Sequence, residues 1–224
     1  MLRKDDTNLA DSWLDGALAG FAADNDDLVL QTRSLLLAIV ADAPCHARLA
    51  NTLSMLEHIG SYKIMTTQHR SDIDEPTLKH VHEEAGHAHF MKRQAEKTAQ
   101  RPLEYVDDDL LAPASARMYF QRLEAAMLRT LAQQRSARAV YLYMSMIIEL
   151  RALWFYGLYQ QTLQRAHHPL SLKRVLGEEQ NHLGDVAHRL EMAGELSDAR
   201  TEQFVGYEKA LFGRLLAAMQ RAVA

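Results

Sequence analysis

The stretch Glu83-Glu84-Ala85-Gly86-His87 decides the fold of this chain together with its second copy, Glu178-Glu179-Gln180-Asn181-His182. Each copy follows a stretch of helical character that carries one isolated glutamate in an apolar setting, Glu57 before the first copy and Glu149 before the second. The order E…ExxH…E…ExxH therefore offers four carboxylates and two imidazoles. Carried inward on four helices, these groups are the ligand set of a di-metal site inside a helical bundle.

A single ExxH motif is weak evidence for such a site. The chain has 11 His among 224 residues, so any Glu has roughly a 5% chance of a His three positions later, and about one match arises by accident. The evidence therefore depends on where the four glutamates lie.

All four glutamates fall on largely apolar helical faces by the i±3, i±4 and i±7 rule. Their neighbours on these faces are Ala50, Leu53 and Ile64 for Glu57, Met91 for Glu84, Leu142, Met146 and Leu153 for Glu149, and Val175, Leu183, Val186 and Leu190 for Glu179. Burying an unpaired ionised carboxylate costs several kcal/mol, so a compensating cation is needed. For any single glutamate, an Arg or Lys partner is an equally good explanation. Four glutamates together with two histidines favour a metal.

The spacing within each half supports the same interpretation. Glu57 and Glu84 are 27 residues apart, and Glu149 and Glu179 are 30 apart. A two-helix hairpin of that length, rising about 1.5 Å per residue, brings both carboxylates to nearly the same height. Four carboxylates and two imidazoles form a hard, oxygen-rich site that suits iron or manganese, whereas structural zinc prefers thiolates.

The rest of the chain is predicted to be helical. Gly (10) and Pro (5) are scarce, and no strand pattern is persuasive. We expect helices over about 9–22, 28–41, 45–69, 75–100, 113–132, 137–165, 170–193 and 198–221. Neither Gly nor Pro separates 113–132 from 137–165, so these two could form one rod. The stretch 101–113 is the least structured part of the interior and is expected to connect two helical pairs.

Composition excludes several classes of protein. A formal net charge of −4 gives no basic footprint for nucleic acid. The single cysteine, Cys45, allows neither an internal disulfide nor a CxxC pair. The N-terminus resembles no signal peptide, and no stretch approaches the roughly 18 apolar residues of a membrane span. We therefore expect a cytoplasmic protein that binds neither membrane nor nucleic acid.

These motifs resemble those of the ferritin-like di-iron carboxylate superfamily. The matching core comprises residues 45–69, 75–100, 137–165 and 170–193, within one all-α domain over 1–224 that adds N-terminal helices and a C-terminal helix. The resemblance implies two iron ions, with manganese or a mixed Fe/Mn pair as the alternative. The implied ligands are Glu57, Glu84, His87, Glu149, Glu179 and His182. Glu84 and Glu179 would bridge the two ions, and no catalytic residue is implied beyond the ligands.

Further residues have supporting roles. In many members of this superfamily, the acid before the ExxH glutamate hydrogen-bonds the histidine of the opposite motif, which implies that role for Glu83 and Glu178. His80 lies one turn before Glu84 on the same face, as an additional ligand or a neighbour of the ligands. Tyr156 shares the face of Glu149 and is the best aromatic candidate for contact with substrate or for electron transfer. By contrast, Tyr62, Tyr143, Met146 and Trp154 are expected to be packing residues. His58, His82, His89 and His188 are expected to lie away from the site.

Three functions of different class remain open. The first is an oxidase or oxygenase that uses O₂ on a small, apolar substrate and needs an electron donor. The second is a ferritin-like iron-binding or peroxide-detoxifying protein without an organic substrate. The third is a metal-free bundle acting in protein interaction. The chain could also form a homodimer. One cysteine rules out a rubredoxin-type module.

Overall fold

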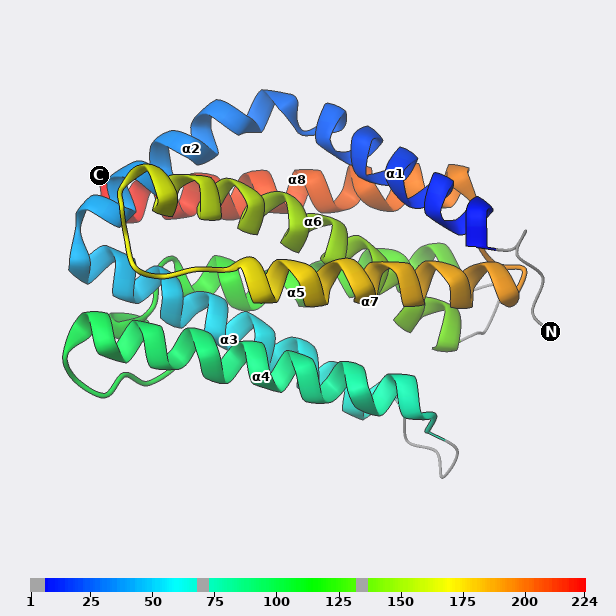
Figure 1. The fold of residues 1–224 in the computed structure, drawn as a ribbon, viewed down its shortest axis with the longest axis horizontal. Coiled ribbons are helices and arrows are strands. Elements are labelled where there is room, and N and C mark those ends of the chain that lie inside the picture. The colour runs from blue at the N-terminus through cyan, green and yellow to red at the C-terminus, as the bar shows by residue number, and fades with distance from the viewer. Residues whose placement is uncertain (1–6, 68–72, 132–136) are drawn as a thin grey trace.

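The computed structural model describes residues 7–67, 73–131 and 137–224, and these residues are all-α, as predicted. They contain no strand (Figure 1). Their α-helices are α1 (Thr7–Asp24), α2 (Asp26–Ala41), α3 (Ala43–Thr67), α4 (Glu75–Ala99), α5 (Pro113–Leu131), α6 (Ala137–Arg165), α7 (Lys173–Met192) and α8 (Asp198–Val223), with a short 3₁₀ helix, η1, over Asp107–Asp109.

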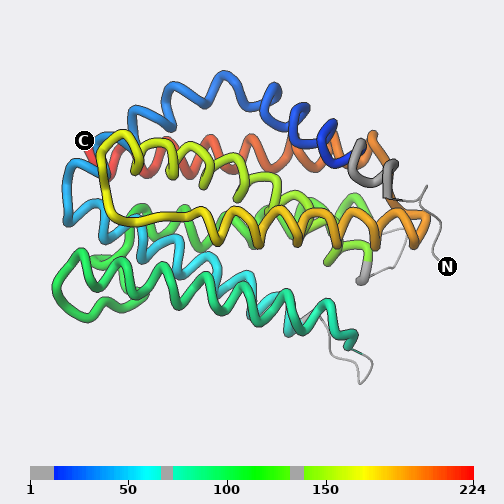
Figure 2. Tube along the Cα trace, viewed as in Figure 1, coloured from blue at the N-terminus to red at the C-terminus, as the bar shows by residue number. Residues whose placement is uncertain are grey.

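Two antiparallel helix pairs form the part of the fold that carries the EExxH motifs. The helix α3 packs along α4, and α6 packs along α7. Figure 2 shows the two helices of each pair running in opposite directions. The remaining helices cover these pairs: α1 and α2 lie with α8 on one side of α6 (Figure 1), and α5 packs against both α6 and α8.

The helix ends follow local sequence signals. Asp74 caps α4, because its Oδ1 accepts a hydrogen bond from the backbone N of Thr77 at 3.0 Å. Pro76 occupies the first turn, where its missing N–H costs nothing. The helix α7 ends just before Gly194, whose φ of 66° lies in the left-handed region that favours glycine.

Two predicted features of the helices need correction or refinement. The helices α5 and α6 are not one rod but pack side by side, so that Phe120 of α5 and Ile148 of α6 line the same cavities. The helix α7 begins at Lys173 rather than at 170, because the backbone of Leu172 is not helical. The backbone N of Leu172 donates instead to Oε1 of Gln160 at 2.6 Å. The predicted helix ends at 69 and 132 fall outside the described residues.

The connection between α4 and α5 is more ordered than predicted. Its carboxylate at Asp109 accepts hydrogen bonds from Nη2 of Arg101 at 2.5 Å and from the backbone N of Glu104 at 2.8 Å. Asn51 on α3 donates to the carbonyl oxygens of Glu104 and Asp109. These bonds satisfy backbone groups that no helix satisfies, so the connection is fixed against α3.

Within the described ranges, no single helix has the length and apolar character needed to cross a membrane. The pair α2 and α3 satisfies the length and composition criterion only when the two are taken together, and they are bent by 118° relative to each other.

Candidate metal centre

The six residues expected as ligands converge from four helices. Glu57 comes from α3, Glu84 and His87 from α4, Glu149 from α6, and Glu179 and His182 from α7. Five of them are buried, with Glu84 the most exposed at 7% and Glu179 the least at 1%. Glu57 is partly exposed. The helical faces inferred from the sequence therefore do point these side chains toward one place.

The converging side chains form two groups that share one residue. In the first, the His80 group, ligand atoms of His80, Glu84, Glu149 and His182 lie within 4.8 Å of one another. In the second, the Glu57 group, the same holds for Glu57, Glu84, His87 and Glu179. Each group offers carboxylate and imidazole donors at a separation that could hold one ion.

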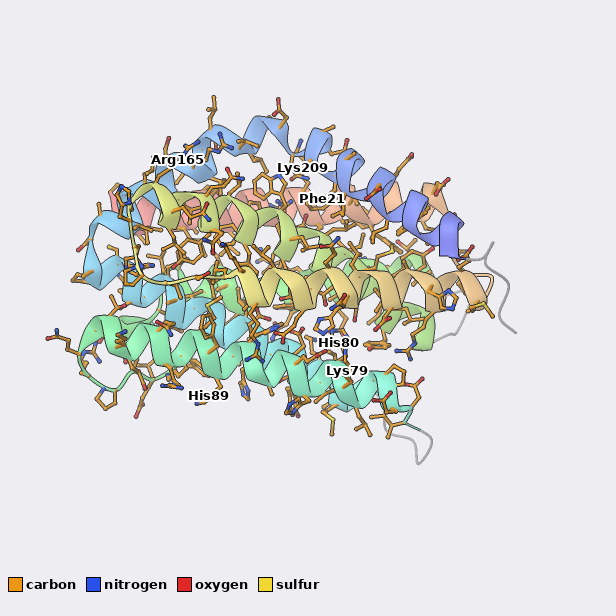
Figure 3. The ribbon with its side chains drawn as sticks, viewed as in Figure 1. Phe21, Lys79, His80, His89, Arg165 and Lys209 are labelled. Atoms are coloured by element: carbon orange, nitrogen blue, oxygen red, sulfur yellow. The ribbon has the colours of Figure 1, made fainter. Side chains whose placement is uncertain are left out.

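His80 belongs to the cluster itself. Its Nε2 lies 3.1 Å from Oε1 of Glu149 and 3.5 Å from Oε1 of Glu84. Its Nδ1 lies 3.2 Å from the hydroxyl of Tyr141. Figure 3 shows His80 between α4 and α7, whereas His89 projects from the outer side of α4. The sequence left two roles open for His80, and its position fits that of a further ligand.

Glu84 and Glu179 lie between the two groups. Oε1 of Glu84 is 3.3 Å from Nδ1 of His182 and 3.7 Å from Nδ1 of His87. Glu179 directs Oε2 toward Nδ1 of His182 at 3.1 Å and Oε1 toward Nδ1 of His87 at 3.3 Å. A carboxylate with one oxygen near each histidine has the placement of a bridging ligand.

The leading glutamate of each motif bonds the histidine of the other motif. Nε2 of His182 lies 2.8 Å from Oε2 of Glu83, and Nε2 of His87 lies 2.9 Å from Oε2 of Glu178. An ionised carboxylate only accepts hydrogen bonds, so each histidine donates through Nε2 and keeps Nδ1 directed into the cluster. This arrangement fixes the orientation of both rings.

Glu83 and Glu178, the two outer glutamates of the cluster, each also contact a cation on their own helix. Lys79 lies 3.1 Å from Glu83, and Arg174 lies 3.0 Å from Glu178. Burial alone would raise the pKa values of Glu83 and Glu178, but their hydrogen bonds with the histidines and with these cations lower them. The two outer glutamates are therefore held in the ionised, accepting form.

Two buried atoms of the cluster have no hydrogen-bond partner among the described residues. They are Oε1 of Glu84 and Nδ1 of His87. Buried polar atoms are normally satisfied, so an orphaned oxygen and nitrogen that face each other within a ligand cluster need an explanation. A cation bound between them satisfies both. The residues present therefore fit a metal ion.

In the absence of a metal ion, bound protons compensate the negative charge of the clustered carboxylates. Burial, followed by the neighbouring carboxylates Glu84 and Glu179, raises the pKa values of Glu57 and Glu149 well above their usual range. Burial would by itself lower the pKa values of the histidines, but the carboxylates beside them raise that of His87 to about 9 and that of His182 to about 10. Protons thus balance the carboxylates here, and metal binding would release them.

The pKa of Glu84 shifts in the opposite direction from those of Glu57 and Glu149. Burial would raise its pKa, but the histidines beside it, first His182 and then His80 and His87, outweigh that effect and lower it. Glu84, which belongs to both groups, consequently stays ionised. This is the charge state that a ligand between two cations requires.

Tyr156 lies directly beside the cluster. Its buried hydroxyl donates a hydrogen bond to Oε1 of Glu57. Burial and the neighbouring Glu57 raise the pKa of Tyr156 well above its usual range, so the phenol keeps its proton. Tyr156 is thus placed to hold a proton at Oε1 of a candidate ligand.

The residues predicted to have no role at the metal site lie away from the cluster. Tyr143, Met146 and Trp154 pack within the hydrophobic core, and Tyr62 is 64% exposed. The side chains of His58, His82, His89 and His188 are exposed. These residues lie outside the cluster, as expected. The prediction that Tyr62 is a packing residue is wrong, because its side chain is exposed to solvent.

Two largely apolar cavities adjoin the cluster, and Glu57, Glu84 and Glu149 line both of them. Cavity A, of about 60 Å³, extends between α3, α5 and α6 to the Lys63–Glu124 ion pair. Cavity B, of about 80 Å³, extends toward α8, where Phe212, Leu215 and Met219 line it. Each has room for several water-sized groups. Small molecules could therefore reach the carboxylates from either side.

Comparison of the chain with known protein families, curated proteins and solved structures finds no match. The interpretation of the cluster therefore depends on its own residues and geometry.

Proposed function

We propose that the cluster binds two iron ions, with manganese or a mixed pair as the alternative, in a ferritin-like arrangement of α3, α4, α6 and α7. We further propose that the protein uses O₂ to oxidise or oxygenate a small, mostly apolar substrate. The observation that carries the proposal is the pair of buried ligand groups joined at Glu84 and open to cavity B.

Each group would hold one ion. His80, Glu149 and His182 would bind the first ion, and Glu57 and His87 the second, with Glu84 and Glu179 between them. Two divalent ions would balance the charge of four carboxylates. The first position has two imidazoles and the second has one, so the two ions would differ in affinity and in reactivity.

Two reduced metal ions held side by side can together supply electrons to O₂. The chain's own residues contribute the environment for that chemistry. Glu83 and Glu178 orient the two histidines, and Tyr156 holds a proton at Oε1 of Glu57. The apolar walls of cavity B keep water away from a substrate bound beside the carboxylates. Repeated turnover would require an external electron donor.

Cavity B favours an enzyme over a protein that only binds iron or removes peroxide. Storage of iron needs ligands and an entry path, but it does not need an apolar chamber beside the ligands. Cavity B is such a chamber, with Phe155, Phe212 and Leu215 in its wall. Apolar cavities beside a few convergent polar groups are the usual form of small-molecule sites.

Anaerobic loading with Fe(II), followed by removal of excess metal and elemental analysis, tests metal binding. We expect about two ions per chain in the native protein. Glu84→Ala should lose at least one, because Glu84 belongs to both groups. His82→Ala, an exposed histidine on the same helix, should leave the count unchanged. Failure to retain either iron or manganese would disprove the proposal.

A second experiment tests the reaction. Iron-loaded protein is incubated in air with a reductant and a pool of cell metabolites, and products are identified by mass spectrometry. Loss of two hydrogens or gain of an oxygen atom in one small molecule is the expected result. Consumption of O₂ and peroxide with no changed metabolite would instead support the detoxifying function.

A further inference from the structure

Arg151 is a buried cation in the wall of cavity B. It lies on α6, two positions after Glu149, and its side chain is 5% exposed. Its guanidinium carbon lies 3.9 Å from the ring centroid of Phe212 and 4.7 Å from those of Phe21 and Trp154. Three aromatic rings therefore fix the plane of the guanidinium at the α8 side of the cavity.

Two of the three guanidinium nitrogens of Arg151, Nε and Nη2, already donate hydrogen bonds. Nε donates to Oε1 of Glu208 at 2.8 Å, and Nη2 donates to Oε2 of Glu208 at 2.7 Å and to Oδ1 of Asn25 at 2.6 Å. Tyr119 donates a further hydrogen bond to Glu208. By contrast, the buried Nη1 of Arg151 has no partner in the described part of the chain. Arg151 thus has unused donors but no unbalanced charge.

We propose that Nη1 of Arg151 binds a neutral hydrogen-bond acceptor of the substrate, such as a carbonyl, amide or hydroxyl oxygen. The substrate would place this oxygen against Arg151 and its apolar body along Phe155, Phe212 and Leu215. Its reacting end would then lie beside Glu57, Glu84 and Glu149, which line the same cavity. That the bound molecule is a substrate rests on the proposed function, whereas the binding site itself does not.

The chemical class follows from what Arg151 lacks. A guanidinium has only donors, so its partner must be an acceptor. Glu208 already neutralises Arg151 through a two-point contact, and the pair is almost fully buried. A second carboxylate here would leave a net buried negative charge, which is costly. A neutral acceptor satisfies Nη1 without that cost.

The same geometry would orient a molecule bound in cavity B. The two tyrosine hydroxyls that line cavity B are already engaged, since Tyr119 donates to Glu208 and Tyr156 donates to Glu57. A site with a buried, unused donor discriminates strongly against an analogue that lacks the acceptor, because the donor is then left unpaired. Arg151 would therefore select among apolar molecules of equal size.

The test measures ligand binding to the metal-free protein by calorimetry, with three probes of equal heavy-atom count: cyclopentanone, methylcyclopentane and butyrate. Arg151→Lys keeps a cation opposite Glu208 and removes Nη1. We expect this variant to bind cyclopentanone about tenfold more weakly, the value of one hydrogen bond, and methylcyclopentane as well as the native protein does. Arg165→Lys, the same substitution at an exposed arginine of α6 that does not line cavity B, should leave both affinities unchanged.

Several outcomes would overturn the inference. One is an equal effect of Arg151→Lys on cyclopentanone and methylcyclopentane. Another is tighter binding of butyrate than of cyclopentanone to the native protein, which would identify an anion site. If Arg151→Lys does not fold, the arginine side-chain NMR signals of the native protein decide: those of Arg151 should shift with cyclopentanone and not with methylcyclopentane, and the reverse would contradict the assignment.

Because these measurements need no metal, they separate this inference from the proposed function. Selective binding of cyclopentanone by a chain that retains no iron or manganese would keep the acceptor site and remove the enzyme proposal. Binding of two metal ions, together with ligand binding that does not depend on Arg151, would keep the enzyme proposal and remove the acceptor site.

Discussion

Nε2 of His182 on α7 lies 2.8 Å from Oε2 of Glu83 on α4, 99 residues away in the sequence. The contact has a counterpart in the 2.9 Å separation between Nε2 of His87 and Oε2 of Glu178. Each EExxH motif thus supplies a histidine to the cluster and the carboxylate that orients the histidine of the other motif. The two copies therefore depend on each other, and a change in one should be measurable at the other.

Glu83→Gln should weaken metal binding at the His80 group about 10–100-fold, the usual effect of losing a carboxylate that orients a ligating histidine. The amide cannot hold Nε2–H of His182 as strongly as a carboxylate does. Affinities for each ion are measured by competition with a chelator of known affinity. Glu178→Gln should act in the same way on the Glu57 group, through His87.

The matched control for both variants is Glu191→Gln, which removes an exposed carboxylate from α7. It should leave both metal affinities unchanged. Equal loss of affinity at both groups in Glu83→Gln would show that the carboxylate acts on the whole cluster and not through His182.

Removal of metal should lower the stability of the native protein. A ligand that binds only the folded state at a hundredfold excess over its Kd adds about 2.7 kcal/mol to the free energy of unfolding. Thermal unfolding with and without EDTA measures this difference. Glu84→Ala should show a smaller gain on adding iron, because Glu84 belongs to both groups. An identical gain in the two proteins would argue that the iron stabilises some other site.

The helix pairs and the inward glutamates could be predicted from the sequence because they depend on local geometry. The i±3 and i±4 rule places Glu179 and His182 on one apolar face without reference to any other helix. The role of His80 could not be decided in this way. His80 and Glu84 were correctly placed on one face, but the 3.1 Å approach of His80 to Glu149 depends on the distance between α4 and α6.

Arg151 was missed for a different physical reason. It lies two positions after Glu149, so periodicity places it on another side of α6. That side is buried because α8 supplies Glu208 and the residue before α2, Asn25, completes its hydrogen bonds. The helix α6 has buried residues around most of its circumference. In such a helix the apolar pattern gives little information about which polar residues are enclosed.

Glu149→Gln should stabilise the metal-free protein at neutral pH. Burial and the neighbouring Glu179 and Glu84 raise the pKa of Glu149, so its contribution to stability is fully present below the pKa of the unfolded chain and is lost as pH rises through the folded value. Glutamine is neutral at every pH and avoids this loss. We expect a gain of about 1–3 kcal/mol at pH 7, the usual scale for buried polar groups.

Chemical denaturation of the metal-free proteins between pH 4 and 7 measures this effect. The advantage of Glu149→Gln should shrink toward pH 4, where Glu149 is protonated in both states. The same variant should lose the stabilisation by metal at the His80 group. An advantage that is constant over this pH range would mean that packing, and not charge, causes it.

His46 gives a pH-dependent prediction that is independent of the metal centre. It is 2% exposed, its Nε2 bonds the hydroxyl of Tyr159, and burial together with the nearby His168 lowers its pKa to about 4. The unfolded chain binds a proton at this residue near pH 6.5, before the folded chain does. His46 therefore contributes full stability above pH 6.5 and loses it progressively as pH falls toward 4.

The loss between pH 6.5 and 4 should reach about 3 kcal/mol, since each pKa unit corresponds to about 1.4 kcal/mol. His46→Gln cannot titrate, so the native protein should lose that much more stability than the variant over this range, measured by urea denaturation. His82→Gln, which removes an exposed histidine, should parallel the native protein. If His46→Gln also parallels it, then His46 is protonated equally in the folded and unfolded states, and its burial beside Tyr159 does not exclude the charged form.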